Sequence, residues 1–231
     1  MPAWLPTRCW PPARTARRRS KIGASGDDPD KKARLLPSPW TVSASRYSFR
    51  DRWLAVRSDS CIAADGVAID PYHIVELPDW VNVVALTSAR DIVLVREYRH
   101  GTAEITLELP SGTVEKSEST LDTAQRELRE ETGYGGGLWH RTGRNAANPA
   151  RQNNHVTTFL ALDVEPVSVP TPEPGEVMEM LTMPLPALFA GLADGSLQFH
   201  GQHLGSLFNA LLPSLTSGEA MDAAIGLWRA R

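Results

Sequence analysis

A cluster of charged side chains lies between Arg126 and Glu131, in the stretch RELREE. On a helix of about 3.6 residues per turn, side chains three and four positions apart share a face, so Glu127, Glu130 and Glu131 project together. Carboxylates on one face repel each other, and a hard divalent cation such as Mg²⁺ or Mn²⁺ reverses this cost through oxygen ligation. The spacing therefore favours a metal site, although a solvated helix face has the same composition.

The residues around this cluster predict one bounded, amphipathic helix. Leu121, Ala124 and Leu128 recur at the spacing of a single helix face and are expected to dock it on a core. Ser119, with an acid three residues later, resembles a capping box, and Gly133 stands where a left-handed C-cap is wanted. The acidic residues would then lie on the face turned away from the core.

A longer pattern surrounds the predicted helix. Residues Glu108 to Gly112 end a predicted strand in Pro and Gly, and a loop leads from there into the helix. The stretch that follows, GTVEKSESTLDTAQRELREETGY, resembles the Nudix box, the signature of hydrolases that act on a nucleoside diphosphate linked to another moiety. Only Tyr134 stands where an aliphatic residue is more usual. The matching positions are Gly112, Glu118, Arg126, Glu127, Leu128, Glu130, Glu131 and Gly133.

The resemblance implies a role for each box residue. Direct metal ligands would be Glu127 and Glu131, with Glu130 binding a further ion or its waters and the carbonyl of Ser111 completing the site. Arg126 would hold the carboxylates through charge-assisted hydrogen bonds. The implied cofactor, Mg²⁺ or Mn²⁺, would lower the pKa of a water that attacks phosphorus in line, and the reaction would split a P–O–P bond into two phosphorylated fragments.

Residues before the box point to one branch of the family. The stretch Arg96-Glu97-Tyr98-Arg99, followed by Glu108-Leu-Pro-Ser-Gly, resembles the "RQYR … ELPAG" of ADP-ribose pyrophosphatases and related nucleotide-sugar hydrolases. Pro149 also lies where that branch tends to carry a proline. The resemblance implies that Arg99 and Glu108 bind substrate, and that ADP-ribose is hydrolysed to AMP and ribose 5-phosphate. The alternative for Arg99 is a strand-end residue paired with a nearby acid.

The loop after Pro149 departs from that pattern, because it lacks the glycine and the acidic residue that are typical there. Arg151 in this loop is expected to bind a phosphate or sugar hydroxyls, while a polar surface loop is the competing interpretation. The departure leaves GDP-mannose-like sugars or a broader nucleoside diphosphate pool as alternative substrates. A non-catalytic Nudix sensor domain is the alternative outside the enzymes, and it would usually have lost box glutamates.

A general base is expected from a loop beyond the box. The segment TPEPGEVMEM offers Glu173 and Glu176, and its Pro/Gly-rich composition suits a lid that closes on substrate. Either glutamate would orient the attacking water. Alternatively, the metal activates the water without a dedicated base.

Composition favours one enzyme domain with an appendage. The chain has 231 residues, 42% of them hydrophobic, and a net charge of −3, which gives no overall bias toward nucleic acid. Residues 1–38 carry nine Lys/Arg against three Asp, a local charge of +6. We therefore expect a disordered basic, Pro/Arg-rich extension at 1–39, N-terminal strands at 40–78 and the hydrolase domain at 79–231.

The same survey indicates a cytoplasmic protein without a membrane partner. The extension holds no apolar run long enough for a secretory segment or a membrane span. Two cysteines, Cys9 and Cys61, suggest no disulfide framework and are compatible with a reducing compartment. The expected partners are a small nucleoside diphosphate substrate and, from the resemblance, a second copy of the chain.

The hydrophobic pattern predicts strands on both sides of the box and helices near the C-terminus. The expected strands are Tyr47–Arg57, Ser60–Ile69 broken at Asp65-Gly66, Tyr72–Leu77, Trp80–Leu86, Ile92–Tyr98, His155–Val164 and Met178–Leu181. Helices are expected at Leu185–Leu192, Leu204–Leu212 and Ala220–Trp228. The fold class is therefore α/β, with the mixed sheet of a Nudix-type α/β/α sandwich after an N-terminal antiparallel β meander.

Overall fold

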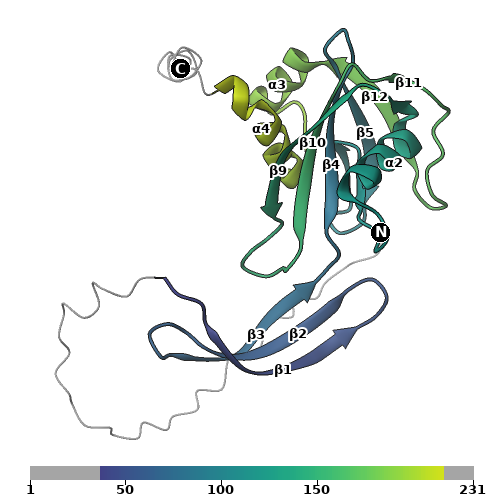
Figure 1. Ribbon diagram of the computed structural model, residues 1–231. Helices are drawn as coiled ribbons and strands as arrows, with labels where there is room; N and C mark the ends of the chain where they lie inside the picture. Colours follow the sequence, from purple (N-terminus) through teal and green to yellow (C-terminus); the bar gives the residue numbers. More distant parts are fainter. Residues whose placement is uncertain (1–36, 216–231) are drawn as a thin grey trace, which may run out of the picture.

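The computed structural model describes residues 37–215, which form a three-stranded sheet followed by a larger sheet with helices on both faces (Figure 1). Most of the basic extension and the predicted helix Ala220–Trp228 lie outside these residues. Within 37–215, every helix is too short or too polar to cross a membrane. The predicted fold class is confirmed, since a separate antiparallel sheet precedes a mixed one.

The N-terminal sheet contains β1 (Thr41–Arg50), β2 (Ala55–Ile62) and β3 (Ala68–Glu76), in that order and all antiparallel. The prediction of one strand over Tyr47–Arg57 is wrong, because the chain reverses at 51–54. There the carboxylate of Asp51 accepts hydrogen bonds from the backbone N–H groups of Trp53 at 2.7 Å and Leu54 at 2.9 Å. Such a side-chain turn competes with strand extension. The turn at Gly66, with φ of 83°, is confirmed.

The main sheet has the order β12-β5-β4-β10-β9, with β6 paired to β5 and β7 paired to β4. Its pairing is mixed, since β10 lies parallel to β4 while the other pairs are antiparallel. β9 was not predicted, because this edge strand has few apolar residues. The strands are β4 (Trp80–Leu86), β5 (Asp91–Arg99), β6 (Glu104–Glu108), β7 (Ser111–Thr113), β9 (Leu138–Ala146), β10 (His155–Leu162) and β12 (Met178–Pro184). A small sheet joins β8 (Tyr134–Gly135) to β11 (Glu165–Pro166).

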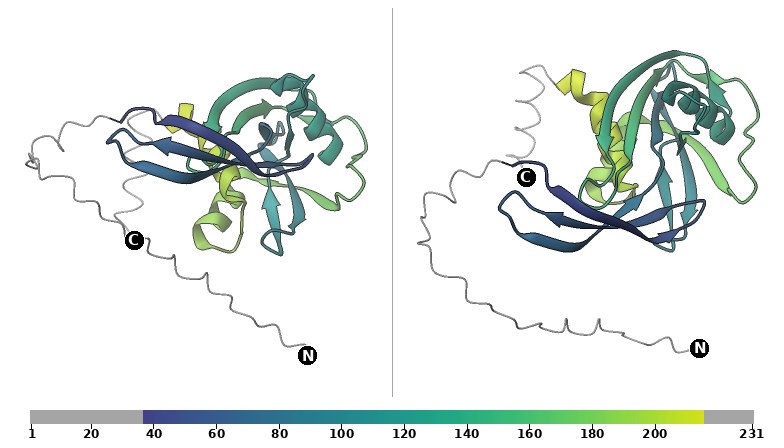
Figure 2. Two further views of the ribbon diagram at one scale, coloured as in Figure 1. Left: turned by 90° about the horizontal axis from the view of Figure 1, so that it is seen from below. Right: turned by 60° about the horizontal axis from the view of Figure 1, so that its bottom comes forward.

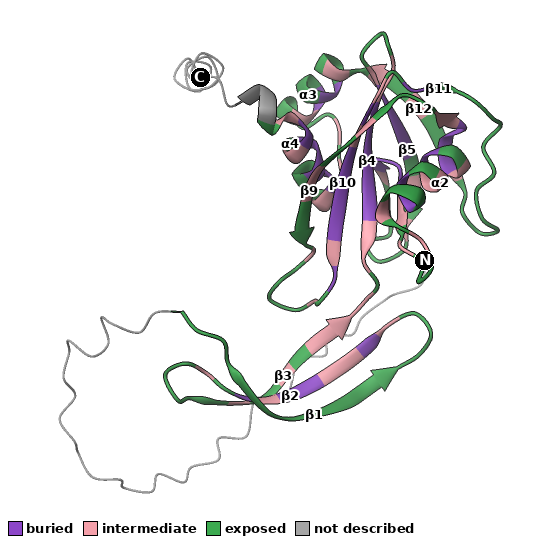
Figure 3. Cartoon of the chain, in the orientation of Figure 1, coloured by how far each residue is buried: buried purple, intermediate pink, exposed green. Residues whose placement is uncertain are grey.

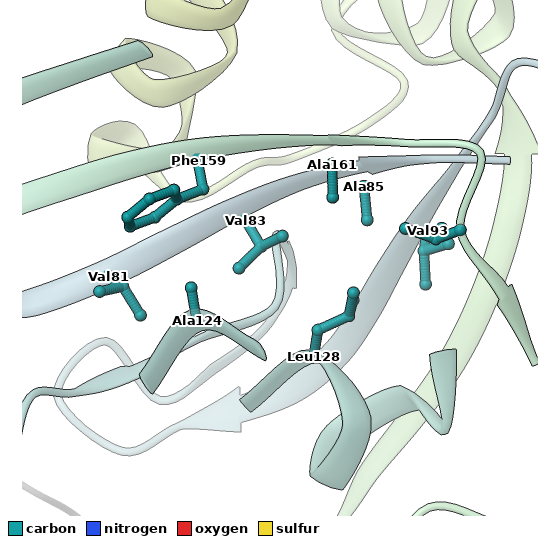
Figure 4. Close-up of a cluster of buried hydrophobic side chains, with 9 residues drawn as sticks. Val81, Val83, Ala85, Val93, Ala124, Leu128, Phe159 and Ala161 are labelled. Carbon is teal, nitrogen blue, oxygen red and sulfur yellow. The ribbon is translucent and has the colours of Figure 1, made fainter. Parts of the chain in front are cut away.

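The two faces of the main sheet bury different side chains of the same strands. Figure 4 shows one face, where Ala124 and Leu128 of α2 (Thr120–Thr132) pack on Val83. On the other face, Val84 belongs to a second core with residues of α3 (Leu185–Asp194) and α4 (Gly201–Leu215). The alternation from Val83 to Val84 is the period of two expected of a strand. Figure 3 shows the result: the central strands are buried, whereas β1 is exposed along its length.

The acidic helix α2 begins and ends as the sequence predicts. The Ser119 side chain accepts a hydrogen bond from the backbone of Asp122 at 3.1 Å, and Gly133 is left-handed with φ of 75°. The predicted apolar stripe is only partly right, because Ala124 and Leu128 are buried but Leu121 is exposed. Leu121 lies in the first turn beside the cap, where solvent reaches the helix. Glu131, near the C-terminal end of the helix, is buried although its side chain is ionisable.

The N-terminal sheet meets the main sheet at the junction between β3 and β4. Figure 1 shows it beyond the lower end of the main sheet, and in the view from below it crosses in front of that sheet (Figure 2). The loop between β9 and β10 lies against it: the N–H of Val75 donates to the carbonyl of Arg151 at 2.7 Å, and Val75 forms a bridge with Gln152. The N–H of Leu77 donates to the side chain of Asn153 at 3.2 Å. This loop therefore fastens the two sheets together.

Candidate active site

The turn between β6 and β7 holds two carboxylates of the acidic helix. Pro110 fixes the turn to β4, since its carbonyl accepts a hydrogen bond from Val83 N–H at 2.9 Å. The next residue, Ser111, donates its N–H to Glu131 Oε2 at 3.1 Å. At Gly112 an added Cβ would lie 1.9 Å from Glu127 Oε1, so any other residue would displace the Glu127 side chain from its present position. Glu127 and Glu131 thus meet the same short stretch of backbone.

Arg126 links three glutamates of the box. Its Nε and Nη2 donate to the two oxygens of Glu118 at 2.9 and 3.0 Å, a bidentate pair. Its Nη1 lies 3.0 Å from Glu130 Oε2 and 2.9 Å from Glu127 Oε1. Planar guanidinium groups suit such forked contacts, which fix geometry as well as charge. Arg126 consequently sets the positions of Glu127 and Glu130 relative to the loop at Glu118.

Glu131 is a carboxylate in a nearly dry place. Its residue is 7% exposed, and burial raises its pKa well above the ordinary value. The hydrogen bond from Ser111 opposes this shift, while the negative charges of Glu127, Glu176 and Glu97 add to it. Burial disfavours the charged form, and nearby like charges disfavour it further. The hydrogen bond from Ser111 therefore does not offset the cost of burying the negative charge of ionised Glu131.

Glu127 shares this environment. Burial raises its pKa to about 7, against an opposing effect of Arg126 and with further increases from Glu130 and Glu176. The Glu127 side chain is 15% exposed, so the two carboxylates are largely withdrawn from water, and their ionised forms are unfavourable unless a positive charge joins them. The single positive charge of Arg126 does not neutralise them, because Arg126 forms ion pairs with three carboxylates, those of Glu118, Glu127 and Glu130. The structure thus concentrates more negative charge between α2 and the β6–β7 turn than it neutralises.

This charge fits a hard divalent cation with a partly aqueous coordination shell. Within residues 37–215, no three His, Cys, Asp or Glu side chains are arranged as a complete metal site. Mg²⁺ does not require one, since it is commonly held by one or two carboxylates together with waters and substrate phosphates. The residues present that could hold it are Glu127, Glu131 and the adjacent Ser111 carbonyl. Glu130 is held by Arg126, at the margin of this group.

Arg99 and Glu108, both predicted to bind substrate, form a bidentate pair. Arg99 Nε lies 2.7 Å from Glu108 Oε1 and its Nη2 lies 2.6 Å from Oε2. The Glu108 side chain is 1% exposed, whereas that of Arg99 is 41% exposed. Burial alone would raise the pKa of Glu108, but hydrogen bonds from Arg99 and Thr106 outweigh it and lower that pKa. Glu108 anchors Arg99, which is the solvent-facing member of the pair, and the substrate-binding role of these two residues stays a prediction.

The loop that carries the candidate bases lies along the C-terminal end of α2. Thr171 N–H donates to the Glu130 carbonyl at 2.7 Å. Within the loop, the negative charge of Glu176 is one of the smaller causes that raise the pKa values of Glu127 and Glu131. Glu173 is exposed and its N–H donates to the Glu176 side chain at 3.0 Å. Both candidates are exposed, and of the two only Glu176 is among the charges that raise these pKa values.

Arg151 lies away from the acidic helix. Its guanidinium stands 5.1 Å from the centre of the Tyr72 ring, and its backbone is bound by Val75. These contacts are with the N-terminal sheet. The two interpretations, a substrate-binding side chain and a polar surface loop, both stay predictions.

Glu97 was not predicted as a site residue, and the structure places it beside Arg99. Its side chain is 16% exposed and lies 3.1 Å from the Nη2 of Arg99. It follows Arg96 in the stretch whose family pattern carries glutamine at this position, so the exchange of Gln for Glu was the available signal. Glu97 and Glu108 divide the guanidinium of Arg99 between them.

The raised pKa of Glu127 predicts how the metal-free protein responds to pH. The folded state holds a proton on Glu127 up to about pH 7, whereas the ordinary pKa of 4.5 applies to the unfolded chain. The folded state therefore binds more protons between these values, and the contribution of Glu127 to the free energy of unfolding falls as pH rises through this window. The free energy of unfolding, measured by urea unfolding in EDTA, should fall less between pH 5 and pH 8 in Glu127→Gln than in the wild type.

Glu165→Gln is the matched control, because Glu165 is exposed on β11. Its free energy of unfolding should fall between pH 5 and pH 8 by as much as that of the wild type. An equal fall for all three proteins would show that Glu127 does not carry the buried charge described above.

Comparisons with known proteins agree with this arrangement. A NUDIX domain model matches residues 77–200, and a model of the nucleoside diphosphate sugar hydrolase N-terminal domain matches residues 40–79. A methanol dehydrogenase activator of Bacillus methanolicus is 46% identical, and an ADP-ribose pyrophosphatase of Bacillus subtilis (strain 168) is 42% identical. Each alignment spans 62 residues, 27% of this chain and 34% of the relative. The chain thus aligns with about a third of the length of these relatives.

A solved structure shares the fold over most of its length. The crystal structure of an ADP compounds hydrolase aligns with a TM-score of 0.66 and 24% identity, covering 76% of this chain and 94% of that one. The NUDIX match covers more than half of the chain and contains the acidic helix, the β6–β7 turn and the Arg99–Glu108 pair. The chain belongs to the Nudix family.

Proposed function

We propose that this protein is a metal-dependent hydrolase that cleaves the pyrophosphate bond of a nucleoside diphosphate linked to a sugar. ADP-ribose, split into AMP and ribose 5-phosphate, is the foremost candidate substrate. The observation that carries the proposal is a pair of carboxylates with raised pKa values, the buried Glu131 and the largely buried Glu127, beside Ser111 and Gly112 at the start of β7. The matches to a sugar hydrolase N-terminal domain and to an ADP-ribose pyrophosphatase support the choice of substrate class.

Each residue of the site has a task in this reaction. Bound Mg²⁺ or Mn²⁺ would neutralise phosphate charge and acidify a water. Glu127 and Glu131, with the Ser111 carbonyl, would hold the cation, and Arg126 keeps Glu127 and Glu130 in register. The exposed guanidinium of Arg99 is placed to bind a phosphate or sugar oxygen, since Glu108 fixes its orientation from behind.

In the proposed reaction, water attacks one phosphorus of the pyrophosphate. The oxygen of water forms a bond to one phosphorus, and the bond between that phosphorus and the bridging oxygen breaks. Glu176 accepts the proton of the attacking water, because it is the loop glutamate whose charge reaches Glu127 and Glu131. Glu173, exposed and bonded to Glu176 through its N–H, steadies the loop.

The alternatives differ in how well the site supports them. GDP-mannose-like sugars or a broader nucleoside diphosphate pool fit the same metal site, and the N-terminal domain match names the general class of nucleoside diphosphate sugars. A non-catalytic sensor fits less well, since the buried carboxylate pair and its Arg126 clamp are intact. We place the enzyme in the cytoplasm, in keeping with the free thiol of Cys61, and assign it no nucleic acid or membrane partner.

We also propose that residues 40–78 form a dimerisation unit, distinct from the hydrolase domain at 79–231 and from the extension at 1–39. Apolar side chains of β1 face solvent, among them Val42 at 52% exposure, Tyr47 at 46% and Phe49 at 50%. Trp53, in the turn after β1, is 67% exposed. Side chains of this kind are typical of a surface that another protein covers.

The hydrolase proposal predicts the outcome of a substrate panel. Purified protein with Mg²⁺ or Mn²⁺ should hydrolyse ADP-ribose faster than GDP-mannose, ADP-glucose, dinucleoside polyphosphates or oxidised dGTP. Glu131→Gln should lower kcat/KM by about 100-fold or more, because the amide cannot serve as an anionic ligand. Glu165→Gln, an exposed glutamate exchanged for the same amide, should retain wild-type activity.

Two results would count against this proposal in different ways. Full activity of Glu131→Gln would remove the metal assignment. Faster hydrolysis of nucleoside triphosphates than of ADP-ribose would contradict the proposed substrate class but not the proposed metal site.

The dimer proposal predicts a mass near twice 25.3 kDa in multi-angle light scattering. Replacing Tyr47 and Phe49 together by serine removes apolar surface from β1 and should give the monomer mass. A wild-type monomer at micromolar concentration would contradict the proposal.

A further inference from the structure

The outer edge of β6 is held by the segment that leads into α4. β6 pairs with β5 along one edge. Along the other, Leu107 N–H donates to Gln198 O at 3.4 Å, and His200 N–H donates to Leu107 O at 3.3 Å. Two residues further, where the next outward-facing N–H belongs to Leu109, the acceptor is the imidazole of His203 at 3.0 Å. A side chain thus takes the place of a strand carbonyl.

His203 is a buried, neutral imidazole with a defined tautomer. The residue is 2% exposed and packs against the rings of Phe199, 6.2 Å away, and His200, 4.5 Å away. Because Leu109 N–H is a donor, Nδ1 must be unprotonated, and the ring proton of the neutral form is on Nε2. Burial, followed by His200, lowers its pKa to about 3. The ring therefore stays an acceptor although it lies 3.9 Å from Glu108.

Leu109, whose N–H is bound by His203, lies between two residues of the proposed site, Glu108 and Ser111. Leu109 directly follows Glu108, which fixes the guanidinium of Arg99 through two hydrogen bonds. It precedes Ser111 by two residues, and Ser111 N–H binds Glu131. Leu109 is itself fully buried. A shift of its peptide would move the Arg99 side of the site first, since Pro110 is separately fixed to Val83 on the metal side.

We propose that His203 is a positioning residue for substrate binding: it fixes the Leu109 peptide, and through Glu108 it sets the direction of the Arg99 guanidinium. This inference rests on the proposed function in one respect, the assignment of Arg99 to the substrate. It adds α4, which contributes no residue of the Nudix box, to the parts of the chain that shape the site. Displacements of about 1 Å at a positioning group are large enough to change turnover or binding markedly.

Two substitutions separate the hydrogen bond from the volume of the ring. His203→Asn keeps an acceptor, because an asparagine side-chain oxygen can occupy the place of Nδ1. His203→Leu fills a similar space without an acceptor. Ser206→Ala is the matched control, since Ser206 is equally buried on the same helix but binds Asn82 and Thr158, each at 2.9 Å, on other strands.

The first measurement is steady-state kinetics with ADP-ribose. His203→Leu should raise KM by about tenfold or more with kcat within about threefold, because substrate contact is lost while the metal side remains. His203→Asn and Ser206→Ala should keep KM within about threefold of the wild type. An unchanged KM in His203→Leu, or an equal rise in Ser206→Ala, would overturn the proposal.

The second measurement does not need a substrate. Proton exchange of the Leu109 amide and of the Arg99 Nε–H, followed by NMR, should accelerate in His203→Leu and stay slow in the other two variants. If Arg99 Nε–H exchange is unaffected in His203→Leu, His203 does not position Arg99. If the exchange changes as expected but no nucleoside diphosphate sugar is hydrolysed by the wild type, the proposed function fails and the positioning role stands.

Discussion

The burial of like charges between α2 and the β6–β7 turn is the constraint on which the rest of the site depends. Burial raises the pKa values of both Glu131 and Glu127, and the charge of Glu127 raises that of Glu131 further. Such an arrangement is costly in a free protein and becomes favourable when a cation joins it. In the proposed metal site, part of the free energy of cation binding would come from relieving this unfavourable burial of charge.

The surrounding structure keeps the carboxylates in this unfavourable position. Ala124 and Leu128 dock α2 on the sheet, and the hydrogen bond from Ser111 fixes Glu131 at the turn. Gly133 then ends the helix with its carbonyl accepting from Ser168 at 3.1 Å, which brings the loop of Glu176 beside the site. An alanine at Gly133 would put Cβ 2.3 Å from the Ser168 carbonyl. Packing, capping and loop position thus serve the same group of charges.

The box, its helix and the central strands could be predicted from the sequence because their signals are local. Caps, helical spacing and runs of buried Val and Leu depend on neighbours within a few residues. The solvent exposure of single side chains could not be predicted in this way. Leu121 shares a helical face with Leu128 but lies in the first turn, where it is exposed. Glu108 was predicted to bind substrate, but its side chain is 1% exposed and lies behind Arg99. The tasks of Arg151 and His203 depend on contacts with β3 and β6, which no local pattern encodes.

Metal binding to a variant at Gly112 tests the central claim most directly. In Gly112→Ala the new methyl group would lie 1.9 Å from Glu127 Oε1, so the flexible carboxylate must move while the backbone can stay. Gly101→Ala is the control, since a Cβ there meets nothing within 4 Å. Titration with Mn²⁺ followed by electron paramagnetic resonance should show wild-type affinity in Gly101→Ala and a loss of about tenfold or more in Gly112→Ala. Equal affinity in all three proteins would contradict the account.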